Sequence, residues 1–138
     1  MSEHTKPLPR ITPDNQPFWD ALRERKLVLP HCAACAKPHL PPGPVCPFCF
    51  ADRLEWRPAS GRGTVSTWTV VHKEWLPAFA ADIPYNVVQV ELEEGPRMMA
   101  HIVDVAPDPA ALRCDLPLEV VFEDLTAEIT LPKFRPVS

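Results

Sequence analysis

The sequence predicts a mainly β protein with an N-terminal arm and helix in residues 1–26, a cysteine-rich module in 27–57 and a small closed barrel in 58–138. Three observations lead to this fold class. The 138 residues include 19 prolines and only 4 glycines, which disfavours long helices and favours short strands joined by rigid connections. Two closely spaced cysteine pairs occupy the middle of the chain. Alternation of apolar and polar residues dominates the second half.

Composition limits the function classes. The net charge of -4 and the pI near 5.7 argue against a general nucleic-acid binder, which normally has a basic surface. The first residues lack the apolar core of a signal peptide, and no stretch approaches the roughly 20 apolar residues of a membrane span. We therefore expect a cytoplasmic protein without a membrane partner.

A short amphipathic helix is expected over residues 14–25. Asp14 or Asn15 can cap it, and Pro17 suits its first turn. Phe18 and Trp19 are adjacent on this helix. The favoured interpretation is packing against the protein's own domain, and the alternative is that the two aromatics meet a partner.

The cysteine-rich module has short strands at 27–29 and 54–56 and a proline-rich loop at 36–45. Two residues separate the cysteines of each pair, and ten residues separate the pairs. Such pairs form tight turns that bring four sulfurs around one ion, the arrangement of structural zinc. The expected ligands of one structural Zn²⁺ are Cys32, Cys35, Cys46 and Cys49.

Four thiolates fill a tetrahedral shell and leave no open position for a catalytic water, so the metal is expected to be structural. His31 and His39 lie beside the pairs and are not needed as ligands. Iron accepts the same geometry and stays an alternative. Cys114 stands alone and is expected to be a packing residue.

Five strands are expected in the barrel. A turn at Gly61–Gly63 opens it, and a turn at Glu94–Pro96 makes a hairpin of the second and third strands. The expected strands are Thr64–His72, Val87–Leu92, Met98–Val103, Leu118–Glu123 and Thr126–Leu131.

Aromatic residues gather in and after the first barrel strand. They either contact a ligand or partner at the barrel mouth or seal the end of the barrel, and the sequence leaves both open. These residues are Trp68, Trp75, Phe79 and Tyr85. Near the C-terminus, Lys133 and Arg135 flank Phe134, and the two cations can meet a phosphate or the carboxylates of a partner.

A nucleophile with an adjacent base is not evident. His72 and His101 lie within expected strands, where they are more often rim or face residues than catalysts. No glycine-rich loop suits a phosphate. The residues favour a binding or assembly module over a stand-alone enzyme.

The order of these pieces resembles one family. The pieces are Phe18-Trp19, the two cysteine pairs, Gly61-x-Gly63-x-Val65, Pro84-Tyr85, Glu94-Gly95-x-Arg97 and Leu131-Pro132-x-Phe134. The chain is similar, from about Asn15 to Pro136, to the OB-fold, rubredoxin-like zinc-ribbon proteins associated with acyl-CoA metabolism. The family usually has a glycine where this chain has Asp115, and aspartate tolerates a left-handed backbone better than most residues.

The resemblance implies a non-catalytic subunit that pairs with a thiolase-like protein or a hydratase. Such a subunit shapes the substrate channel, binds a coenzyme A thioester or passes it on, and stabilises a hetero-oligomer. The reaction of the complex stays open between thiolysis, acyl transfer and retro-aldol cleavage. Two alternatives are a single-stranded nucleic-acid binder, which the acidic balance disfavours, and an enzyme active as a single chain.

Overall fold

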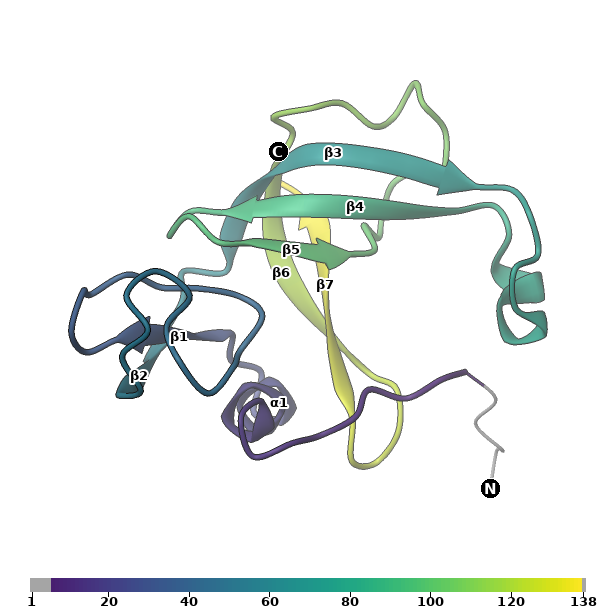
Figure 1. Ribbon diagram of the computed structural model, residues 1–138. Coiled ribbons are helices and arrows are strands. Elements are labelled where there is room, and N and C mark those ends of the chain that lie inside the picture. Colours follow the sequence, from purple (N-terminus) through teal and green to yellow (C-terminus); the bar gives the residue numbers. More distant parts are fainter. Residues whose placement is uncertain (1–5, 138) are drawn as a thin grey trace.

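The computed structural model describes residues 6–137, so residues 1–5 of the expected arm lie outside the described part. Within this range no helix is long and apolar enough to cross a membrane. The fold is mainly β with one short α-helix, as predicted (Figure 1). Its elements are α1 (Gln16–Arg23), β1 (Val28–Cys32), β2 (Leu54–Pro58), β3 (Arg62–Val71), the 3-10 helix η1 (Pro77–Asp82), β4 (Tyr85–Leu92), β5 (Arg97–Ala100), β6 (Pro117–Asp124) and β7 (Thr130–Pro136).

Helix α1 lies between the β1–β2 hairpin and the barrel and packs against β1 and β7 (Figure 1). Pro17 occupies its first turn, as expected. Asn15 precedes the helix but does not cap it, because its Oδ1 instead accepts a hydrogen bond from the N–H of Thr12 at 2.7 Å. Phe18 and Leu22 are buried, so one helix face belongs to the protein's own core.

Five strands form the barrel in the order β5-β4-β3-β6-β7, with antiparallel neighbours throughout. One parallel bridge between Ile102 and Phe134 joins the two edges of the sheet within residues 6–137. The sheet is therefore a curled, partly open barrel, which is the five-stranded pattern of the OB fold. The expected OB-type fold is confirmed, with an opening on the side of β5 and β7.

The barrel core is aliphatic and joins the cysteine-rich module through α1 and β1. Its fully enclosed side chains come from four strands of the barrel and from the elements below it. They include Leu22, Leu29, Val65, Val88, Val90, Leu118 and Phe134.

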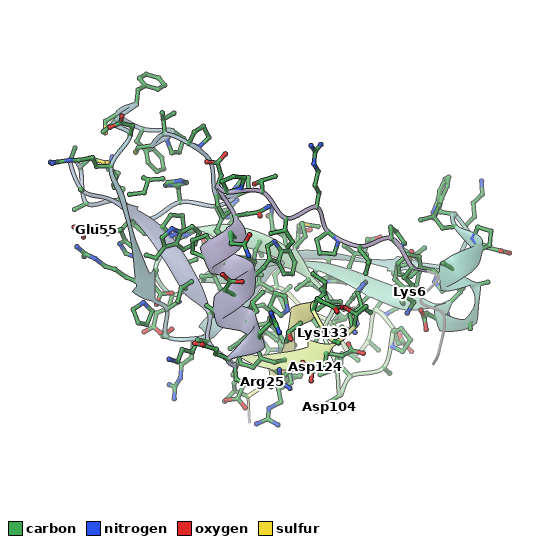
Figure 2. All side chains as sticks on the ribbon, turned by 90° about the horizontal axis from the view of Figure 1, so that it is seen from below. Lys6, Arg25, Glu55, Asp104, Asp124 and Lys133 are labelled. Atoms are coloured by element: carbon green, nitrogen blue, oxygen red, sulfur yellow. The ribbon has the colours of Figure 1, made fainter. Side chains whose placement is uncertain are left out.

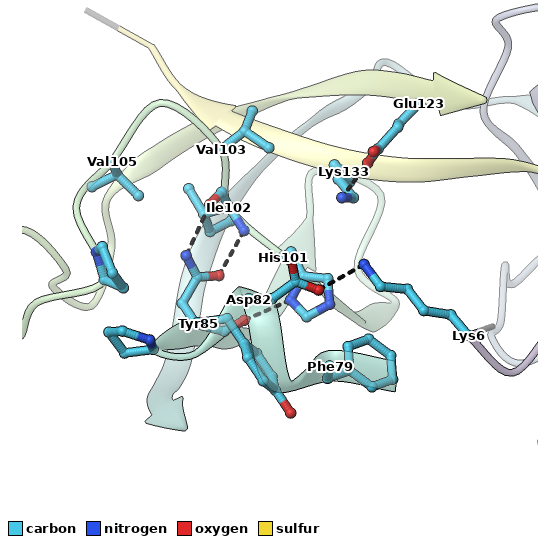
Figure 3. Close-up of a pocket in the computed structure, with 13 residues that line it drawn as sticks. Lys6, Phe79, Asp82, Tyr85, His101, Ile102, Val103, Val105, Glu123 and Lys133 are labelled. Atoms are coloured by element: carbon cyan, nitrogen blue, oxygen red, sulfur yellow. Dashed lines mark hydrogen bonds and ion pairs between the residues drawn. The ribbon is translucent and has the colours of Figure 1, made fainter. Parts of the chain in front are cut away.

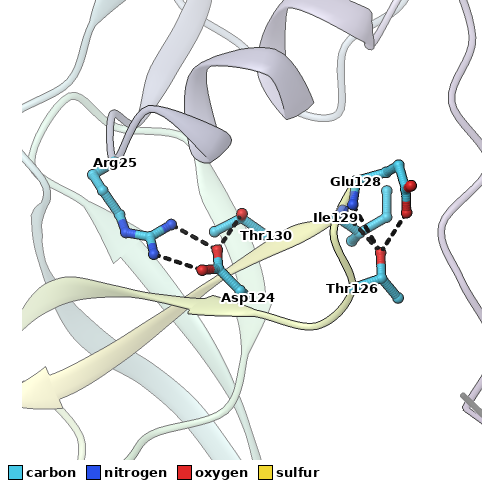
Figure 4. A network of polar contacts seen from close by, with 6 residues as sticks. All are labelled: Arg25, Asp124, Thr126, Glu128, Ile129 and Thr130. Atoms are coloured by element: carbon cyan, nitrogen blue, oxygen red, sulfur yellow. Dashed lines mark hydrogen bonds and ion pairs between the residues drawn. The ribbon is translucent and has the colours of Figure 1, made fainter. Parts of the chain in front are cut away.

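The last strand differs from the prediction. A strand was expected at Thr126–Leu131, but residues 126–129 form a turn in which Thr126 Oγ1 accepts hydrogen bonds from the N–H groups of Glu128 and Ile129 (Figure 4). β7 follows this turn and runs through Pro132 to Pro136. Phe134 consequently points into the core with none of its surface exposed, so its ring packs among the core side chains.

Two glycines at the start of β3 occupy positions that restrict a side chain. Gly61 has a φ of +81°, and a Cβ at Gly63 would lie 2.6 Å from the carbonyl oxygen of Glu91. Asp115 has a φ of 65°, so the aspartate adopts the left-handed backbone expected at the position where the family has glycine.

Candidate functional site

The two cysteine pairs form matching turns. Ala36 and Phe50 each follow the second cysteine of a pair, and each has a φ of 65°. Their N–H groups donate to the carbonyl oxygens of Cys32 and Cys46 at 2.8 and 2.9 Å. The equal spacing of the two pairs thus produces the same local turn twice, which aims both sets of sulfurs at one point.

The four sulfurs lie close together, as the spacing predicts. Cys32 and Cys49 Sγ are 3.5 Å apart, and Cys35 and Cys46 Sγ are 3.7 Å apart. All four lie within 4.8 Å of one another. Sulfurs about 2.3 Å from a tetrahedral zinc ion stand roughly 3.8 Å apart, so the arrangement fits one such ion. The module is a four-cysteine zinc ribbon in its geometry.

Backbone amides support negative charge on these sulfurs. The N–H groups of Cys35 and Ala34 lie 3.4 and 3.3 Å from Cys32 Sγ, and the N–H of Phe48 lies 3.4 Å from Cys46 Sγ. The hydrogen bond from Cys35, with that from Ala34, lowers the pKa of Cys32 to about 6 against the effect of burial. Because zinc binds thiolate, these donors favour metal binding.

The shell of ligands is closed. Cys32 and Cys46 are buried, Cys35 is half-buried and Cys49 is exposed. Among residues 6–137, the group of ligand atoms close enough to share an ion contains these four cysteines and neither His31 nor His39. With four sulfurs in place the site has no position for a reacting water, so it can stabilise the ribbon but cannot activate a nucleophile.

A polar cavity of about 320 Å³ lies at the end of the barrel beside η1 (Figure 3). Phe79, Tyr85 and Lys133, three of the predicted contact residues, line it together. The Tyr85 ring stands edge-on to His101 with centroids 5.6 Å apart. Lys6 reaches across from the N-terminal arm, with its Nζ 5.2 Å from the centre of the Phe79 ring.

Each lysine in this cavity is paired with an acid. Lys6 Nζ lies 2.6 Å from Asp82, and Lys133 pairs with Glu123 (Figure 3). His101 Nδ1 lies 2.6 Å from the carbonyl oxygen of Asn86, which fixes the ring. The cavity thus combines aromatic faces with cations that are partly neutralised.

An apolar groove runs beside α1. It consists of two adjoining hollows of about 390 and 370 Å³. Phe18, Trp19, Met98 and Met99 line both of them. The predicted helix aromatics therefore occupy one wall of a surface groove, with Phe18 buried and Trp19 half-buried.

The remaining predicted contact residues lie elsewhere. Trp68 is half-buried and packs against the barrel core. Trp75 is 67% exposed and lies under the ammonium group of Lys73 at 4.3 Å, away from both hollows of the groove. Arg135 is exposed, and its Nε donates to Glu119 at 2.6 Å.

Sequence reasoning assigned Lys6, Met98 and Met99 to no site and expected His101 only as a rim or face residue. Lys6 and His101 line the polar cavity, and Met98 and Met99 line the groove. Two successive methionines on a strand must face opposite sides, so one of them had to be exposed on any half-buried strand. No sequence pattern indicates that Lys6 lines the polar cavity, because its position depends on the path of the N-terminal arm.

A separate clasp ties the end of α1 to the barrel. Arg25 donates two hydrogen bonds to the carboxylate of Asp124, both at 2.8 Å, and Thr130 Oγ1 donates a third at 2.7 Å (Figure 4). Figure 2 shows Arg25 and Asp124 side by side next to the helix. Arg25 and then Thr130 lower the pKa of Asp124.

Family models match both modules. Residues 19–55 match the rubredoxin-like zinc ribbon domain of ChsH2, and residues 56–123 match its C-terminal OB-fold domain. A DUF35 domain-containing scaffold protein of Methanocaldococcus jannaschii is 32% identical over 127 residues, which cover 86% of this chain and 88% of the relative. The chain belongs to the DUF35 family.

One further relative and one solved structure carry names that mention enzymes. A protein of Thermomonospora curvata named "Probable enoyl-CoA hydratase alpha subunit" is 40% identical over 133 residues, or 95% of this chain, but the chain spans only 40% of its length. A solved structure named "Ltp2-ChsH2(DUF35) aldolase" contains a chain with 37% identity and a TM-score of 0.83, covering 94% of this chain and 98% of that one.

Proposed function

We propose that this protein is a non-catalytic, zinc-containing subunit of a thiolase-like or hydratase complex that acts on acyl-CoA thioesters. In that complex it stabilises the partner and shapes the channel through which the substrate passes. The reactive groups belong to the partner. Thiolysis, acyl transfer and retro-aldol cleavage of a carbon–carbon bond are all compatible with this role.

The observation that carries the proposal is the near full-length likeness to the ChsH2 chain, which is named together with Ltp2 as an aldolase. The chemistry of the residues supports it. The four sulfurs close their metal site, and the residues that line the polar cavity with His101 include no serine, threonine or cysteine. An arrangement of this kind suits assembly better than catalysis.

The four cysteines would hold a single Zn²⁺, which would stabilise the ribbon. The β1–β2 hairpin is short, and each of its strands has five residues. Small modules of this size rarely fold without a metal or disulfide. Zinc would therefore contribute folding free energy, and the ribbon would present a fixed surface to the partner.

The polar cavity is the proposed contact for coenzyme A. Phe79 and Tyr85 offer ring faces to an adenine or pantetheine group, and Lys6 and Lys133 would bind phosphates that displace Asp82 and Glu123.

Co-purification tests the proposal. The chain is expressed with an affinity tag in its own host, and the proteins that stay bound through size-exclusion chromatography are identified by mass spectrometry. The expected result is a stable complex with a thiolase-like or hydratase subunit, in which the chain melts at a higher temperature than alone. A stable monomer whose melting temperature no such subunit changes would contradict the proposal.

A further inference from the structure

Among residues 6–137, no strand pairs with the outer edge of β5. In the β4–β5 hairpin the N–H of Leu92 donates to the carbonyl oxygen of Pro96 at 2.9 Å, which fixes that pair as hydrogen-bonded. Hydrogen-bonded pairs alternate along an antiparallel ladder. Met98 and Ala100 therefore direct their backbone groups toward β4, and the N–H and C=O of Met99 point outward.

The seam between β5 and β7 closes at one end only. Beyond β5, the carbonyl oxygen of His101 accepts a hydrogen bond from Phe134 at 3.1 Å, and Val103 donates to Phe134 at 2.8 Å. The next residue of β7 in position to donate, toward Met99, is Pro132. Proline has no N–H, so the ladder stops there and the outward groups of Met99 keep no partner in β7.

The open part of the seam is lined mainly by apolar side chains, together with Arg97, His101 and Lys133. The 370 Å³ hollow lies between β5 and the start of β7, with α1 as its floor. The 390 Å³ hollow continues it toward Leu40, Pro41 and Pro42. Met99 stands at the rim with 59% of its surface exposed. A free backbone edge and an apolar groove thus lie side by side.

Proteins normally protect an exposed strand edge with charges, proline or a covering segment. β5 begins with the charged Arg97, and the rest of the strand, Met98-Met99-Ala100, contains no charge and no proline. An edge of this kind pairs readily with another extended chain, which gains main-chain hydrogen bonds and places alternate side chains in the groove.

We infer that the open seam binds an extended apolar segment of the partner enzyme subunit, which adds a strand to the outer edge of β5. The assignment rests on the proposed accessory role and names the surface that carries it. Main-chain pairing with Met99 gives the segment its position, and contact with Trp19 and Met98 buries its apolar side chains. Methionine is flexible and polarisable, which suits a surface that receives another chain.

Hydrogen–deuterium exchange of the wild-type chain, free and in the purified complex, tests this surface. Fragmentation that resolves single amides separates Met99 from its neighbours. The expected result is at least tenfold slower exchange at Met99 in the complex, roughly the effect of one protected hydrogen bond. Met98 and Ala100, already bonded to β4, serve as internal references.

The possible outcomes distinguish a failure of the seam assignment from a failure of the proposed accessory role. If an enzyme subunit binds and Met99 exchanges at its free rate, the partner docks elsewhere and the seam assignment is wrong while the accessory role stands. If no enzyme subunit binds, the accessory role fails and the assignment fails with it. Slow exchange at Met99 in a dimer of this chain alone would show that a second copy occupies the seam, which also overturns the assignment.

A pair of variants distinguishes backbone pairing from side-chain contact. Met99→Pro removes the outward N–H without removing a bond to β4, whereas Met99→Ala keeps the N–H and removes the side chain. Dissociation constants for the enzyme subunit are measured for variants whose melting temperatures match the wild type. At least tenfold weaker binding of Met99→Pro, with a smaller effect of Met99→Ala, is expected for β-addition. Equal binding of Met99→Pro and the wild type would contradict it.

Discussion

Replacing Cys46 by serine should release the metal and unfold the ribbon. Cys46 is fully buried, and its Sγ lies 3.7 Å from that of Cys35. The main apolar anchors of the ribbon are Leu27 and Leu29, whose burial contributes roughly 3–6 kcal/mol together. A structural zinc contributes about 10–16 kcal/mol in small zinc-binding peptides. Packing alone is therefore too weak to hold the ribbon when the metal leaves.

The assay combines metal analysis with hydrogen–deuterium exchange. The wild type should carry one zinc per chain and show protected amides in both modules. Cys46→Ser should lose zinc and protection over residues 27–57, while residues 62–136 keep theirs because most buried side chains of the shared core lie in the barrel. Cys114→Ser is the matched control, since Cys114 is exposed and only donates to the carbonyl oxygen of Ser66 at 3.4 Å. A Cys46→Ser chain with one bound zinc and a protected ribbon would show that Cys46 is not needed to bind the metal or to hold the ribbon folded.

Three further predictions concern the barrel. Gly63→Ala should destabilise it by about 1–3 kcal/mol in urea unfolding because the new methyl group meets a backbone carbonyl, whereas Gly43→Ala, with open space around it, should change the stability by less than about 0.5 kcal/mol. Phe134→Ala should cost about 3–5 kcal/mol in the same assay, and a cost below about 1 kcal/mol would show that the ring is not in the core. Asp124→Asn should lower stability at neutral pH. Arg25 depresses the pKa of Asp124 in the folded state, so the carboxylate stabilises the fold above its unfolded pKa of about 3.9 and loses this effect as the pH falls below it. The difference in the free energy of unfolding between the wild type and Asp124→Asn should therefore become smaller in acid. A difference that does not depend on pH would contradict a stabilising ion pair between Arg25 and Asp124.

The cysteine site was predictable because its geometry is local. Each pair needs only two intervening residues and one left-handed residue after it, at Ala36 and Phe50. The strands with clean alternation, such as β4, were predictable for the same reason, since period-two patterning needs no knowledge of distant partners. Asp115 adopts the left-handed backbone for which aspartate is suited.

The last strand was not predictable from local propensity. Pro132 and Pro136 argue against a strand, but β7 lies at a sheet edge on the side where their missing N–H groups cost little. The same Pro132 interrupts the seam with β5. Pro132 therefore also lines the apolar groove beside α1.

The cavity was only partly predictable, because it depends on contacts between distant segments. Asn86 binds the backbone N–H and C=O of Ile102 with its side-chain amide, at 2.7 and 2.8 Å, and so continues the hairpin beyond β5. This clamp places His101 beside Tyr85, and the arm brings Lys6 over Phe79. No spacing in the sequence predicts these contacts between distant residues.

The most direct test of the central claim is turnover of an acyl-CoA thioester by the purified components, separately and together. We expect no turnover by this chain alone at any substrate concentration. We expect turnover by the partner subunit to fall when the wild-type chain is replaced by Cys46→Ser, because the unfolded ribbon no longer supports the complex. Turnover by this chain alone, or a partner whose activity and stability are the same without it, would contradict the account.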